Sequence, residues 1–156
     1  MSSKALSKTR EVHLIDIENL LGGSWFNADQ VAQFRTFYLS HNNVADDAQI
    51  ILATSSEQGA IEAGLGWAGA RTLFRLGHDG ADLALLEVLE EENLHARFTK
   101  IVIASGDGIF ASAAEELYAE GLQVEVFARA LSVSGEFTHA SEIVHLFSAS
   151  EFSLAA

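Results

Sequence analysis

The chain of 156 residues contains no cysteine and no proline. Without cysteine it has no disulfide, no thiolate zinc site and no cysteine nucleophile. Residues 1–10 (MSSKALSKTR) lack the apolar stretch of a signal peptide. No run of about 18 uncharged apolar residues, the length that could span a membrane, occurs in the sequence. We therefore expect a cytoplasmic protein with no membrane partner.

Basic residues are scarce: nine Lys and Arg stand against 22 Asp and Glu, for a net charge of −13. Three of the nine lie in residues 1–10, which contain no acidic residue, so residues 11–156 carry six basic against 22 acidic side chains, or −16. Such a body repels polyanions at long range. A nucleic-acid ligand would need a local basic patch, the basic tail or bound cations. The simplest interpretation of the charge is solubility.

Hydrophobic residues make up 49% of the chain, which suits one globular domain. Apolar runs predict strands at 12–17, 49–54, 71–76, 100–104 and 123–127, and 142–147 is compatible with a short sixth. Amphipathic segments at 29–39, 57–69, 81–93 and 109–119 predict helices. This alternation indicates an α/β protein, a three-layer α/β/α fold with a doubly wound, mainly parallel sheet. We expect a flexible basic tail at 1–10, a single domain at 11–148 and a C-terminal tail at 149–156.

An acidic residue follows three of the predicted strands. Asp16 ends the first, Asp82 lies in the first turn of the helix after the third, and Asp107 follows the fourth. The carboxyl ends of parallel strands share one edge of a sheet, where ligands bind. Each acid also has a local interpretation: Asp16 and Asp107 as caps of the following loop or helix, and Asp82 as a first-turn acid in a capping box with Asp79.

Taken together, the three acids favour a metal site, because converging carboxylates repel one another unless a cation lies between them. Hard cations such as Mg²⁺ or Mn²⁺ take oxygen ligands, polarise phosphate groups and activate water. Phosphodiester hydrolysis is a reaction that needs this arrangement. Asn19 and Ser105, near the same strand ends, could add neutral oxygens or position water.

Three segments resemble motifs of NYN domains, a branch of the PIN-like ribonuclease superfamily: IDIENL at 15–20, GADLALL at 80–86 and IVIASGDGIF at 101–110. The resemblance covers about residues 11–148. It implies a PIN-like fold with strand order 3-2-1-4-5 and metal-dependent cleavage of RNA. Asp16, Asp82 and Asp107 then match the metal-binding acids, Asn19 the Asn of the first motif, and Ser105 the Ser of the third.

One position departs from these motifs: Ile109 stands where the third motif has a second Asp. Either Glu18 or Asp79 substitutes for the lost carboxylate, or the protein cleaves slowly or not at all. The alternative function is a catalytically impaired PIN-like domain that binds RNA or protein. Glu18 is otherwise most simply a solvated loop acid.

A few residues could contact RNA or a partner. Arg75 ends the third predicted strand and could meet a phosphate, as could His78, although a salt bridge is the simpler role for Arg75. Trp25 and Phe26 could stack a base, although a core or helix-staple role is the simpler one. A homo-oligomer is compatible with this class. A receiver-like acid pocket is disfavoured, because it needs a Lys after the fifth strand and no Lys follows Lys100.

Overall fold

The structure is a computed structural model and describes residues 10–130 and 143–148. Six parallel strands form one sheet in the order β3-β2-β1-β4-β5-β6. The strands are β1 (Glu11–Asp16), β2 (Gln49–Thr54), β3 (Arg71–Phe74), β4 (Lys100–Ala104), β5 (Gln123–Arg129) and β6 (Ile143–Phe147). The predicted α/β fold and the order 3-2-1-4-5 are confirmed, and β6 extends the sheet by one strand beside β5. Of the predicted tails 1–10 and 149–156, residues 1–9 and 149–156 lie outside the described residues. Arg10 is described, and its carbonyl oxygen accepts hydrogen bonds from the N–H groups of Thr99 and Lys100.

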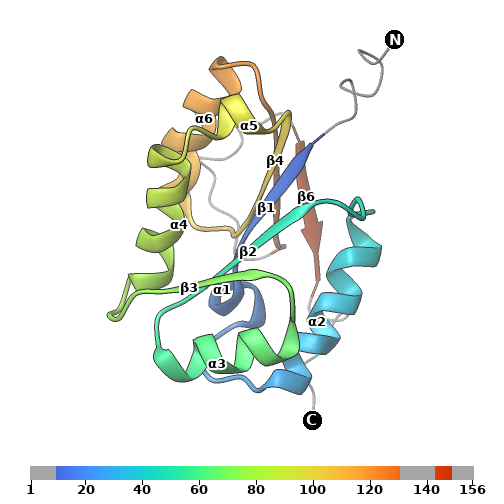
Figure 1. Cartoon of the computed structure of the whole chain (residues 1–156), viewed down its shortest axis with the longest axis vertical. Coiled ribbons are helices and arrows are strands. Elements are labelled where there is room, and N and C mark those ends of the chain that lie inside the picture. The colour runs from blue at the N-terminus through green and yellow to red at the C-terminus, as the bar shows by residue number, and fades with distance from the viewer. Residues whose placement is uncertain (1–9, 131–142, 149–156) are drawn as a thin grey trace.

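Helices cover both faces of the sheet (Figure 1). One face carries α1 (Ile17–Leu21), α2 (Ala28–His41) and α3 (Glu57–Gly66), and the other carries α4 (Gly80–Glu91), α5 (Leu94–Arg97) and α6 (Ala111–Ala119). A single 3₁₀ turn, η2 (Gly108–Phe110), leads into α6. Within the described part of the chain, no helix is long and apolar enough to cross a membrane.

Alternation along β1 supplies side chains to both layers of the core. Val12 and Leu14 pack in the cluster under α4 and α6, whereas Ile15 packs in the cluster under α1, α2 and α3. Successive side chains of a strand point to opposite faces, so Asp16 shares its face with Val12 and Leu14. The last residue of this buried strand is therefore an acid directed toward the α4 side of the sheet.

Local sequence fixes where α1 and α4 begin and end. Gly22 ends α1 in the left-handed conformation (φ 86°), which glycine adopts without strain. Gly80 begins α4 against the backbone carbonyl of Arg75, where a Cβ atom would collide. The close approach of Gly80 to Arg75 holds the start of α4, and with it Asp82, next to the carboxyl ends of the strands.

Candidate active site

A cleft of about 400 Å³ lies across the carboxyl ends of β1 and β4. The strand order reverses at this point, because β2 and β3 lie on one side of β1 whereas β4, β5 and β6 lie on the other. Asp16, Asp82 and Asp107 all line it, together with Glu18, Asn19, Gly23, Ser24, Ser55, His78 and Ala81. The structure thus brings together three acids that lie on separate elements and far apart in the chain.

Asp16 is only 3% exposed at the base of this cleft. Its Oδ1 accepts a hydrogen bond from the backbone N–H of Asn19 at 3.1 Å, which caps α1. Burial raises the pKa of its carboxyl, while hydrogen bonds from Asp82 and Asn19 act in the opposite direction. Asp16 therefore both caps α1 and lines the cleft.

Asp82 lies in the first turn of α4, between the other two acids. Its carboxyl group hydrogen bonds with those of Asp16 and Asp107, and burial together with these neighbours raises its pKa to about 8. The capping box considered for this turn does not form, because Asp79 makes no side-chain cap hydrogen bond. Asp82 thus meets the other two acids of the cleft, and its place in the first turn of α4 also suits the helix dipole.

Asp107 is held by hydrogen bonds on both sides of its Cα atom. Its Oδ1 accepts from the N–H of Ile109 at 3.0 Å, which caps η2, and its own N–H donates to Ser105 Oγ at 3.2 Å. Asn19 ties this loop to β1, because its Oδ1 accepts from the N–H of Gly106 at 3.1 Å, across 87 positions of sequence. These bonds fix the exits of β1 and β4 relative to each other.

Two predicted site residues do not line the cleft. Ser105 is fully buried, and its hydroxyl is used within its own loop. Arg75 lines a separate hollow on the outer side of α4, together with Leu83, Leu86, Glu87, Glu90, Glu91 and Glu92. Ser105 is therefore a support for Asp107, and Arg75 lies among acids rather than at the cleft.

Glu18 was considered as a substitute for the lost carboxylate, but most simply as a solvated loop acid. It is not a solvated loop residue but part of α1, and its carboxylate accepts hydrogen bonds from the backbone N–H and the hydroxyl of Ser55, each at 2.8 Å. Ser55 directly follows β2, so the contact joins two strand exits. Sequence alone gave no signal for this contact, since α1 has five residues and too few turns to show a helical period. Of the two acids considered as substitutes for Ile109, Glu18 lines the cleft and Asp79 is not among its lining residues.

The two aromatic residues after α1 differ in their surroundings. Phe26 packs against the core under α2 and α3, as expected. The core role expected for Trp25 is wrong: its side chain is 90% exposed, in the loop whose residues Gly23 and Ser24 line the cleft. His78, another residue that lines the cleft, is also solvent-exposed, and its Nε2 lies 3.9 Å from Oδ1 of Asp79.

The chemistry of the cleft suits a hard divalent cation, although the side chains of the described residues do not form a ready-made metal site. In residues 10–130 and 143–148, no three His, Asp or Glu groups are arranged to hold an ion. The available donors are carboxylate and amide oxygens, which Mg²⁺ and Mn²⁺ prefer. Burial and the neighbouring carboxyl groups of Asp16 and Asp107 raise the pKa of Asp82, and a cation bound in the cleft would act in the opposite direction.

Comparisons with known proteins bear on the fold alone. No family model matches the chain, and no curated protein does. The chain is similar in structure to a crystallised protein of unknown function from Vibrio parahaemolyticus. The TM-score is 0.60 and the sequence identity 15%, with 90% of this chain and 93% of that one covered. At this identity, the likeness supports the α/β/α architecture and carries no activity across.

Proposed function

We propose that the protein is a metal-dependent ribonuclease whose Mg²⁺ or Mn²⁺ would be held by Asp16, Asp82 and Asp107. The observation that carries this proposal is the meeting of these three acids in one cleft at the strand-order reversal. The resemblance of their three segments to NYN motifs supports RNA as the substrate. The cleft and the motif resemblance involve the same three acids, but the cleft is observed in the structure without reference to any motif.

The reaction is hydrolysis of a phosphodiester. A water oxygen forms a bond to phosphorus, the bond from phosphorus to one ribose oxygen breaks, one water proton is released and the departing oxygen gains one. A cation in the cleft supplies polarisation of the phosphate and acidification of the water. The chain's own contribution is to hold oxygens in place: Asn19 and Ile109 donate backbone hydrogen bonds that orient Asp16 and Asp107.

The test is cleavage of a fluorescent single-stranded RNA in Mn²⁺ by the wild-type protein and by Asp16→Asn and Asp107→Asn. We expect each substitution to lower the rate at least 100-fold, since each removes a charged oxygen from the cleft. Glu90→Gln, an acid outside the cleft, is the matched control and should leave the rate unchanged. Cleavage that persists unchanged in both Asn variants would refute the proposal.

Ile109 favours a second candidate, a PIN-like domain that binds RNA or protein without cutting it. Its side chain is 38% exposed, at the position where the resembling motif carries an Asp. Calorimetric titration with Mn²⁺ distinguishes the two. Binding that Asp16→Asn abolishes supports the ribonuclease, whereas no binding at millimolar Mn²⁺ supports the impaired domain.

A further inference from the structure

The loop between α1 and α2 presents an aromatic surface beside the cleft. Trp25 is 90% exposed, although tryptophan is largely buried in most proteins. Gly23 and Ser24, the two residues before it, line the same cleft as Asp16 and Asp107. Apart from its two chain neighbours, nothing lies within 4 Å of the place where a Cβ of Gly23 would stand, so this position of the loop is open.

A positive charge lies against the other end of this loop. The guanidinium of Arg129, at the end of β5, packs so closely on Gly22 that its Nη1 is 2.6 Å from where a Cβ would be. In residues 10–130 and 143–148, Arg129 has no ion-pair partner. Among the other basic groups, Arg71 and Arg97 pair with Glu92 and Lys100 pairs with Glu125, whereas Arg10, Arg35 and Arg75 form no ion pair among the described residues either. What distinguishes Arg129 is its contact with Gly22, at the start of the loop that carries Trp25.

We propose that Trp25 stacks on an unpaired base of the nucleic acid while Arg129 contacts its backbone, so that the cleft takes single-stranded rather than duplex RNA. This inference rests on the proposed function, because it names the form of the substrate for the same cleft. A base can lie on an indole only when it is free of its partner strand. Stacking also suits a protein of net charge −13, since it needs no long-range electrostatic attraction.

The experiment measures binding separately from cleavage. The full-length protein is titrated into a fluorescein-labelled 12-nucleotide RNA in Ca²⁺, a hard cation used in place of Mg²⁺ or Mn²⁺, and fluorescence polarisation gives the dissociation constant. We expect Trp25→Ala to weaken binding about 5- to 100-fold, as loss of one stacked base does, and Trp25→Phe to restore most of it. Tyr118→Leu, an exposed aromatic on α6 at the opposite end of the sheet, is the control and should bind as wild type does.

The same RNA annealed to its complement tests strand preference. We expect weaker binding of the duplex, with no further effect of Trp25→Ala. The role of Trp25 is overturned if wild type and Trp25→Ala bind the single strand equally. It is also overturned if Trp25→Ala loses the same affinity for the duplex as for the single strand. Because Trp25 is exposed, the thermal midpoint of the variant should match that of the wild type, which separates loss of stacking from loss of folding.

The role of Arg129 has its own measurement. For single strands, the slope of log K against log salt is about −0.7 for each phosphate contacted. Arg129→Gln should reduce the slope by roughly one such contact, and an unchanged slope overturns that contact. If Trp25→Ala cleaves RNA in Mn²⁺ as fast as the wild type does, the stacking role of Trp25 is wrong, whereas the proposed ribonuclease function still stands. If RNA binding depends on Trp25 but no RNA is cleaved in Mn²⁺, the ribonuclease proposal is wrong and the role of Trp25 in binding still stands.

Discussion

Asp82 keeps a proton under conditions where an ordinary aspartate has lost it. Its pKa is raised to about 8 from 3.8, first by burial and then by Asp16 and Asp107. Between these two values the folded protein binds more protons at this position than the unfolded protein does. The contribution of Asp82 to stability is therefore fully present below about pH 4 and is lost as the pH rises through about 8.

Replacing Asp82 by Asn should remove this pH dependence. In buffer with EDTA, we expect Asp82→Asn to be more stable than wild type by about 1–2 kcal/mol at pH 9, the value being reduced by solvent screening because the side chain is partly exposed. At pH 5 the two proteins should differ little. Urea denaturation at both pH values measures the difference, and Asp29→Asn on α2 is the control. A gain of the same size at both pH values would contradict the assigned titration.

Single residues also show what the sequence could predict about the site. Asp16, Asp82 and Asp107 were predictable because strand ends can be located from apolar runs, and parallel strands end at a common edge. Glu18 and Ser55 were not, because their contact joins segments 37 positions apart and depends on how α1 packs beside β2. Trp25 was not either, because composition does not tell an exposed aromatic from a buried one.

At the scale of elements, strands were easier to predict than short helices. Four of the five predicted strands are mainly apolar, as buried parallel strands are, whereas the edge strand β3 is half polar and only partly buried. The helices α1 and α5, with five and four residues, are too short to show a period and were not predicted. The site depends on one of these, since α1 places Glu18 on the cleft and carries Asn19 to the β4 exit. The least predictable element thus contributes directly to the geometry of the cleft.

A buried polar network joins β1 to α2 at the other end of the strand from Asp16. His13 Nδ1 lies 2.6 Å from the hydroxyl of Tyr38, and its Nε2 lies 2.7 Å from a carboxylate oxygen of Glu11. The three side chains are nearly inaccessible to solvent. Burial lowers the pKa of His13 more strongly than its hydrogen bond to the Glu11 carboxylate raises it. This network positions β1 against α2, and its burial leaves it almost no surface with which to meet a substrate.

Tyr38→Phe should destabilise the protein without affecting the cleft. Removing the hydroxyl leaves His13 Nδ1 buried without its partner, which costs about 1–3 kcal/mol. Chemical denaturation measures the loss. Mn²⁺ affinity should be unchanged, since Asp16 lies at the opposite end of β1. A change in Mn²⁺ affinity as large as the stability loss would show that the two ends of β1 are coupled.

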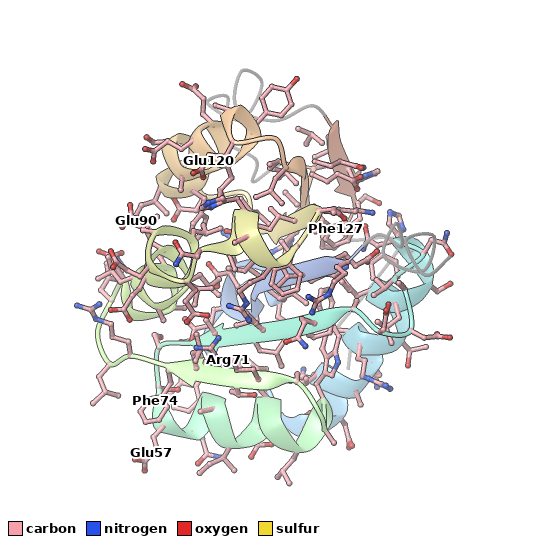
Figure 2. The ribbon with its side chains drawn as sticks, turned by 45° about the horizontal axis from the view of Figure 1, so that its top comes forward. Glu57, Arg71, Phe74, Glu90, Glu120 and Phe127 are labelled. Carbon is pink, nitrogen blue, oxygen red and sulfur yellow. The ribbon has the colours of Figure 1, made fainter. Side chains whose placement is uncertain are left out.

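At the scale of the whole molecule, negative charge is distributed over the surface as well as concentrated in the cleft. Glu90 and Glu120 lie on the outer side of the helical layer formed by α4 and α6, away from the sheet (Figure 2). A net charge of −13 opposes the compact state through self-repulsion, which dissolved salt screens. Cations can therefore stabilise this protein in two ways, by general screening and by occupying a particular site.

The two effects should separate in a thermal melt at pH 8. Raising NaCl from 10 to 500 mM should increase the melting temperature gradually in every variant, because screening acts on the whole charge. At fixed ionic strength, Mn²⁺ at about 100 times its dissociation constant should add about 2.7 kcal/mol, a further rise of roughly 5–10 °C that saturates. The saturable rise should vanish in Asp16→Asn and persist in Glu90→Gln. If Mn²⁺ raises the melting temperature of both variants equally, the ion acts only as a screening salt and the cleft does not bind it.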